Sequence, residues 1–338
     1  MNRILFYITL VMCASCAKEG GYGGELGGTD QALGTMSVRM EYETLITKAQ
    51  SQETVPALDG EKAEKSVRVM VFDQKTGRLA AYKSLSTVSG SSCQFSMPVG
   101  KKTIYAIVNG PDELSTITTV GALEKIVYDL SNSVIEVNGF FMVGKEECDV
   151  VANQTVTPTV SVRRLASRVV LRSVSCSIPE QYGKMKVDCA FLGNAYSKQT
   201  IAGAVDGLLN VNGYAADATS PIGKSNVTGA CPEFFYRSIG KDVAIGGTHS
   251  TMYYMYAQPN KSDRVTCLYL LATIGGSQYY YRVPLSYGLD ANVTYSVDVD
   301  IINLGSELPP DGSVQKGDIS AVIKMTDWIK GEEYDIKF

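Results

Sequence analysis

The 338-residue sequence predicts an all-β fold built of β-sandwiches with few short helices, and three observations support this expectation. Many short stretches alternate apolar and polar residues with a period of two, which is the pattern of strands that bury one face. Turn-forming Gly, Pro and Asn residues separate these stretches, and few segments have helical spacing. Twenty tyrosines, thirty-two glycines and a single tryptophan also fit a β-rich chain with many turns.

The first sixteen residues predict an export signal. Arg3 precedes a short apolar run, residues 4–12, which is too short to span a bilayer as a helix. Small residues directly before Cys16 are typical of a bacterial lipobox, so we expect Cys16 to be lipidated and to anchor the chain to a membrane. The alternative is an ordinary cleaved signal with an unmodified cysteine.

Residues 17–34 predict a glycine-rich, flexible tether, and a strand is predicted after it, at residues 35–44. Four apolar residues alternate with polar ones in this strand: Met36, Val38, Met40 and Tyr42. The polar stretch that follows contains Lys48 and Ala49 and predicts a loop. A well-formed strand therefore stands between two polar linkers.

About 320 residues remain after the signal, which suggests two domains. We expect an N-terminal β-sandwich over residues 35–160 and a C-terminal one over residues 161–338. The boundary is placed at VSVRRLASRVVL, which is long enough to pass from one core to the next. Residues 200–250 are rich in Gly, Ser and Asn and predict long surface loops.

Net charge and cysteine spacing exclude two classes of function. A net charge of −4 and a pI near 5.3 give no electrostatic reason to expect nucleic acid as a partner. Six cysteines lie beyond the lipobox, and none shows the CxxC spacing of a zinc site. Outside the cytoplasm six cysteines could pair in fifteen ways, so their pairing stays open.

Candidate catalytic groups are scarce. Histidine is the commonest general base, and His249 is the only histidine, in a loop-like stretch. The carboxylate pairs Glu146–Glu147 and Asp298–Asp300 are better explained as solvated charges than as glycosidase pairs. No phosphate-binding glycine motif follows a strand. We therefore expect no enzyme, no cofactor and no metal.

In their order along the chain, several segments resemble the fimbrillins, the type V pilins of Bacteroidota. The lipobox, the glycine tether, the first strand and a basic site are followed by VRVMVFDQKTGRL, VGKKTIYAIVNGP, NGFFMVG and VRRLASRVVL. The later segments YYYRVPL, NVTYSVDVDI and TDWIKGEEYDIKF continue the likeness. The resemblance implies two transthyretin-like β-sandwich domains in tandem and assembly by strand exchange.

The resemblance also implies how a subunit matures. A lipoprotein precursor reaches the outer membrane, and a trypsin-like protease cuts after a basic residue and releases the first strand with the lipid. Lys48–Ala49 fits this site better than Arg39, which lies inside the strand, although the family usually has arginine there. A C-terminal strand of a neighbouring subunit, from residues 319–338, then fills the groove. Two sets of donor residues are open: Ile323 and Met325, or Tyr334, Ile336 and Phe338.

The expected function is that of a stalk subunit of an adhesive surface fimbrium, first at the outer membrane and then in the fimbrium. Its expected partners are other copies of itself, anchor and tip subunits, the processing protease and an unidentified host or bacterial surface ligand. Two alternatives remain. One is a tip or anchor subunit. The other is a monomeric surface lipoprotein that keeps its first strand and binds a glycan or host protein through the tyrosine clusters at 253–256 and 279–281.

Overall fold

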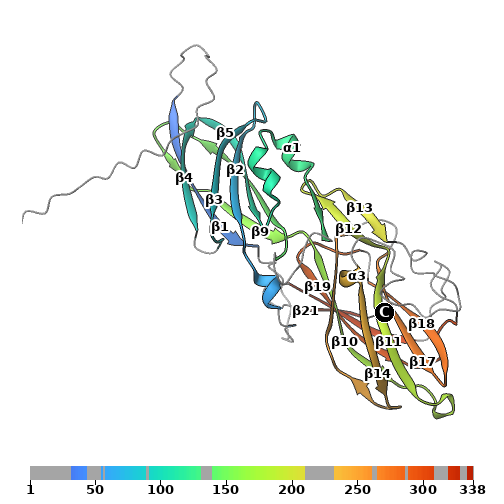
Figure 1. Cartoon of the computed structure of the whole chain (residues 1–338). Helices are drawn as coiled ribbons and strands as arrows, with labels where there is room; N and C mark the ends of the chain where they lie inside the picture. The colour runs from blue at the N-terminus through green and yellow to red at the C-terminus, as the bar shows by residue number, and fades with distance from the viewer. Residues whose placement is uncertain are drawn as a thin grey trace, which may run out of the picture. The chain divides into compact units, whose positions relative to one another are not determined.

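In this computed structural model the described residues are 32–43, 55, 58–88, 91–130, 139–209, 232–260, 265–285, 288–307, 319–327 and 333–337. Residues 32–338 form one compact unit. Strands dominate the described part of the chain, and its helical segments are single turns (Figure 1). The predicted all-β sandwich fold class is therefore confirmed.

The elements of the first half begin at Leu33 and end at Arg164. In order they are β1 Leu33–Tyr42, η1 Asp59–Lys62, β2 Val67–Asp73, β3 Leu79–Leu85, β4 Ser92–Pro98, β5 Gly100–Val108, η2 Asp112–Thr116, α1 Val120–Glu124, β6 Val127–Asp129, β7 Met142–Val150, β8 Thr155–Val156 and β9 Thr159–Arg164. The first strand thus begins within the predicted tether and ends two residues earlier than expected.

The elements of the second half begin at Ser167. In order they are β10 Ser167–Cys176, η4 Glu180–Tyr182, β11 Met185–Gly193, β12 Ala195–Thr200, β13 Val205–Leu209, α3 Pro232–Phe235, β14 Tyr236–Val243, β15 Thr248–His249, β16 Tyr253–Ala257, β17 Cys267–Ile274, β18 Ser277–Pro284, β19 Val293–Ile301, β20 Ile319–Asp327 and β21 Glu333–Lys337.

Both halves follow one strand plan. The order β3-β2-β5-β7 in the first half has its counterpart in β14-β11-β17-β18, and the order β4-β1-β9 has its counterpart in β16-β10-β19. In each half the first strand lies between an antiparallel neighbour and a parallel one. This repeat supports the expected pair of sandwiches.

The central strands of the first half are buried on both faces. In β2, Val69 and Val71 face one hydrophobic core, while Met70 and Phe72 face another. Because neither face meets water, such a strand reads as a nearly continuous apolar run and not as a strict alternation. The first of these cores holds the apolar residues of β1, which positions the candidate site described below.

The second core continues without a break from Met70 to Ile301. In addition β6, from the first half, pairs with β12, from the second. A domain boundary near residue 160 therefore stays a prediction, because packing and hydrogen bonds continue across that position.

The expectation of long loops over residues 200–250 is wrong in part. Strand β14 lies there and pairs with β11 from Met185↔Val243 to Phe191↔Tyr236. It occupies an edge of its sheet, and Ile239 and Val243 are its buried residues. An edge strand with few buried side chains has no clear period of two, so its sequence resembles a loop.

Candidate functional site

The first strand is inserted between two neighbours of its sheet. Strand β1 pairs antiparallel with β4, from Leu33↔Pro98 to Arg39↔Ser92, and parallel with β8 and β9 on its other side. We call the space that β1 fills between β4 and β8–β9 the β1 slot (Figure 1). Because β4 is the end strand of this sheet, the residues of β1 join it to the rest.

The inner face of β1 is completed by the core of the first half. Met36 and Val38 are 0% exposed and Met40 is 5% exposed, while Tyr42 is half-buried against the same cluster. Burying each such side chain stabilises the fold by roughly 1.5–3 kcal/mol. An empty slot would thus expose an apolar groove together with unpaired backbone groups on both of its sides.

Backbone hydrogen bonds fix β1 on the side of β8 and β9. The amide of Thr35 donates to the carbonyl of Gln154 (2.9 Å), that of Arg39 to Pro158 (2.9 Å) and that of Glu43 to Val162 (2.8 Å). The side chain of Arg39 is exposed, but its backbone lies within the ladder. A protease would have to unravel β1 to reach this residue, and cleavage after Lys48 stays a prediction.

Cys93 lies in β4, directly beside β1. It is the ladder partner of Val38 and is 2% exposed, and burial raises the pKa of its thiol to about 11. Among the described cysteines, Cys93, Cys148, Cys176, Cys189 and Cys267 are all free thiols. No local pattern in the sequence places Cys93 next to the first strand, because the pairing of β1 with β4 is set by tertiary structure.

The chain after the expected cleavage site is held by a buried ionic network. Glu61, in η1, accepts a hydrogen bond from Arg168 (2.7 Å) at one carboxylate oxygen and from the Tyr256 hydroxyl (2.7 Å) at the other. The Arg164 guanidinium donates to the Glu61 backbone carbonyl (2.7 Å), and that of Arg168 also donates to the Val55 carbonyl (3.3 Å). This network ties Val55 and Glu61 to both halves of the fold.

Several expected site residues lie outside the described part of the chain: Cys16, Lys48, Ala49 and Phe338. The other expected donor residues lie in the C-terminal hairpin, where Ile323 pairs with Ile336 and Met325 with Tyr334. Strand β20 also pairs with β19 along its whole length. The C-terminal segment is thus a sheet member in this structure, and donation would require it to leave β19.

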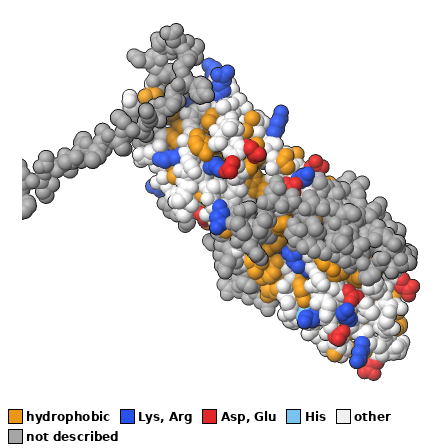
Figure 2. Space-filling model, viewed as in Figure 1, with side chains coloured by type: hydrophobic (Ala, Val, Ile, Leu, Met, Phe, Trp, Pro, Cys, Tyr) orange, Lys and Arg blue, Asp and Glu red, His pale blue; other side chains and the backbone are white. Residues whose placement is uncertain are grey.

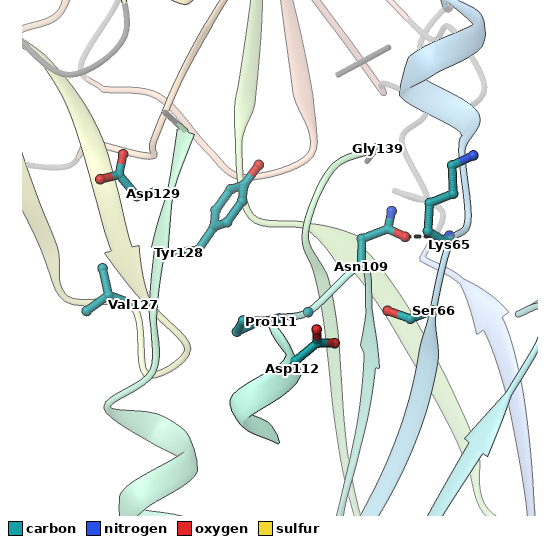
Figure 3. Close-up of a pocket in the computed structure, with 10 residues that line it drawn as sticks. Lys65, Ser66, Asn109, Pro111, Asp112, Val127, Tyr128, Asp129 and Gly139 are labelled. Atoms are coloured by element: carbon teal, nitrogen blue, oxygen red, sulfur yellow. Dashed lines mark hydrogen bonds between the residues drawn. The ribbon is translucent and has the colours of Figure 1, made fainter. Parts of the chain in front are cut away.

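A polar pocket of about 420 Å3 lies elsewhere, lined among others by Lys65, Asn109, Asp112 and Tyr128 (Figure 3). The Asn109 amide is used within the fold: it accepts from the Lys65 amide (2.7 Å) and donates to the carbonyls of Ala63 and Phe140. Since the Asn109 amide is committed to bonds within the fold, the pocket is a weaker candidate than the β1 slot.

The tyrosine clusters of the alternative interpretation are largely buried, although Tyr253 and Tyr254 are only half-buried. Tyr256 and all three tyrosines of 279–281 are buried, at 8% exposure or less.

On the face seen in Figure 2, basic and acidic side chains are interspersed. No helix in the described segments is long and apolar enough to cross a membrane. Among the described side chains, no cluster of His, Cys, Asp and Glu is arranged to hold a metal ion.

The comparison with protein families matches residues 35–161 to the major fimbrial subunit protein (FimA) family. This segment begins in β1 and ends in β9, so it contains most of the residues that form the β1 slot. The predicted resemblance to the fimbrillins is confirmed, and the matched family is one of structural fimbrial subunits and not of enzymes. No curated protein matches the sequence.

Solved structures share the fold over most of the chain. A fimbrilin (FimA) from Porphyromonas gingivalis W83 has a TM-score of 0.57 at 13% identity, covering 87% of this chain and 97% of its own. A candidate cell adhesion protein from Bacteroides eggerthii DSM 20697 has a TM-score of 0.57 at 16% identity, covering 90% and 98%. The tip fimbrial protein Mfa3 from Porphyromonas gingivalis, with a C-terminal truncation, has a TM-score of 0.50 at 14% identity, covering 88% and 100%.

Proposed function

We propose that this fimbrial component is a stalk-type subunit that polymerises by proteolysis-triggered strand exchange. The insertion of β1 between β4 and β8–β9 carries the proposal, since its removal would empty an apolar groove flanked by unpaired backbone groups. A strand from a second copy would restore both the buried apolar surface and the hydrogen bonds.

The precursor is exported with Cys16 lipidated and is held at the outer membrane through that lipid. A trypsin-like protease then cuts after Lys48, between β1 and the buried Glu61 network. Glu61 stays bound to Arg164 and Arg168, and Val55 to Arg168, so the cut frees β1 with the lipid and leaves the rest of the fold tied together. The released strand carries Met36, Val38, Met40 and Tyr42 away with it.

The C-terminal residues 319–338 donate the replacement strand, and the fimbrium serves adhesion to a host or bacterial surface. Stalk assignment is supported by the presence of two alternating strands at the C-terminus, because a polymerising subunit must both accept and donate. Anchor and tip subunits would be its further partners at the ends of the polymer.

Limited trypsin digestion of purified precursor, followed by electron microscopy, tests this function. The native chain should form filaments after the cut, Lys48→Ala should stay monomeric, and a chain lacking residues 319–338 should accept a strand without donating one. Lys65→Ala, in the chain after the network, is the matched control and should polymerise normally. Filaments of Lys48→Ala that retain β1 would refute the mechanism and favour a monomeric binding protein.

Export is tested separately. Cys16→Ala should abolish the lipid mass at the N-terminus and the outer-membrane location, while Cys13→Ala should leave both intact. An unchanged membrane fraction without lipid on Cys16 would contradict the lipoprotein assignment.

A further inference from the structure

At one position of β1, Gly34, only glycine fits into the β1 slot. A Cβ atom on Gly34 would lie 2.4 Å from the backbone oxygen of Val151 and 2.7 Å from a methyl group of Val150. Neighbouring residues hold the backbone close there, because the Asn153 amide donates to the Leu33 carbonyl (3.0 Å) and the Thr35 amide donates to Gln154. A strand that takes the place of β1 must therefore present glycine at this point.

The sequence contains a second segment with the pattern of β1. In β1, Gly34 is followed by apolar residues at the second, fourth, sixth and eighth positions after it. Gly317 is followed in the same way by apolar residues at the same four offsets: Ile319, Ala321, Ile323 and Met325. Serine stands at the third position after the glycine in both, as Ser37 and Ser320.

We propose that residues 317–325 of a second copy enter the β1 slot in one fixed register, with Gly317 in the place of Gly34. The proposal rests on the strand exchange proposed above and specifies its register. Ile319, Ala321, Ile323 and Met325 then replace Met36, Val38, Met40 and Tyr42 respectively. The donor runs antiparallel to β4 and parallel to β9, as β1 does.

The outward residues of the donor agree with this register. Val322 and Lys324 take the places of Arg39 and Glu41, whose side chains are exposed. Exposed positions accept either a polar or an apolar residue at small cost. At the place of Val38 the smaller Ala321 comes to lie against Cys93, so the donor fills the core there less completely than β1 does.

Strand β21 does not have the pattern of a glycine followed by apolar residues at the second, fourth, sixth and eighth positions. Gly331 is the glycine that precedes β21, and placing it at Gly34 would turn Glu333, Asp335 and Lys337 toward the core. Burying three charged groups without partners is strongly unfavourable. Shifting β21 so that its apolar residues point inward puts a side chain at the glycine position. The slot thus selects β20 over β21.

Directed disulfide formation tests the register. Cys93 lies opposite Val38, so Ala321→Cys in the donor should lie opposite Cys93, at a Cα separation of roughly 4.5–5.5 Å, which a disulfide can bridge. Full-length precursor is cut with trypsin, the trypsin is inactivated, and synthetic peptides of residues 315–327 are added under mild oxidation. Mass spectrometry of the digest identifies the linked cysteines.

The Ala321→Cys peptide should link to Cys93, whereas Ile319→Cys and Ile323→Cys peptides, each two residues along the strand, should not. As a second measurement, the unmodified peptide should cap the slot and stop polymerisation. Gly317→Val should weaken capping by about tenfold or more because of the clash at Val151. Lys324→Val, the matched control at an exposed position, should cap normally.

The outcomes separate the two proposals. If the cut chain neither polymerises nor is linked by any peptide, strand exchange itself is wrong. If it polymerises but Cys93 links to the wrong peptide, or Gly317→Val caps as well as the unmodified peptide, only the register is overturned. Capping by a peptide of residues 331–338 at the same concentration would likewise overturn the selection of β20.

Discussion

Val38 lies beside Cys93: the two residues are partners across the β1–β4 ladder, and neither is more than 2% exposed. The reactivity of the Cys93 thiol therefore indicates whether β1 occupies the β1 slot. Burial also holds its pKa at about 11, which keeps it protonated and unreactive while β1 is bound.

We predict that Cys93 reacts with a thiol reagent only after cleavage. At pH 8 the uncut precursor should leave Cys93 unlabelled, and dilute cut protein should label it, because departure of β1 both exposes the thiol and lowers its pKa. Cys189, which is 0% exposed between other strands, is the internal control and should stay unlabelled in both. Equal labelling of Cys93 before and after the cut would show that β1 does not leave.

Gly34→Ala should loosen β1 in the uncut precursor. The added methyl group collides with the Val151 carbonyl, and such overpacking costs about 1–3 kcal/mol. We expect a lower urea midpoint and premature labelling of Cys93. Ser37→Ala, on the same strand and half-exposed, should change neither. A Gly34→Ala precursor as stable as the native chain would remove the steric basis of the register.

Glu61→Gln should destabilise the protein before and after cleavage. The substitution leaves Arg168, 1% exposed, without its charged partner, and breaking a buried pair costs about 3–5 kcal/mol. Lys186→Ala, which removes a more exposed partner of Asp188, should cost at most about 1 kcal/mol in the same urea titration. A loss in Glu61→Gln no larger than in this control would mean that the Glu61–Arg168 pair does not stabilise the fold.

Alkaline pH should destabilise the fold through Tyr105. Burial, and secondarily the hydrogen bond to Glu124 (2.6 Å), raise the pKa of this phenol to about 12. Between pH 10 and 12 the unfolded chain loses the proton and the folded chain keeps it, so stability falls as the pH rises. Tyr105→Phe should show a smaller fall in urea midpoint over this window than the native protein. An equal fall would assign the effect to other buried tyrosines.

The sequence by itself determined the fold class and the existence of the first strand. Met36, Val38 and Met40 alternate because one face of β1 is buried, and a period of two is visible without knowing what covers that face. It also favoured the C-terminal strands as donors. The same reasoning failed for β14, whose edge position leaves too few buried side chains to mark a strand.

Only the tertiary structure decided which strands flank β1 and that position 34 of β1 must be glycine. Cys93, Val151 and Val162 are distant in the sequence and meet β1 through long-range pairing, which no local pattern encodes. The requirement for glycine at position 34 arises from the approach of another backbone and not from a turn in β1 itself. In the sequence, Glu61 is one of several charged residues in a polar stretch. Folding brings it to Arg168 and Tyr256 in a buried site. A buried charge must be paired, so this contact cannot be inferred from the local sequence.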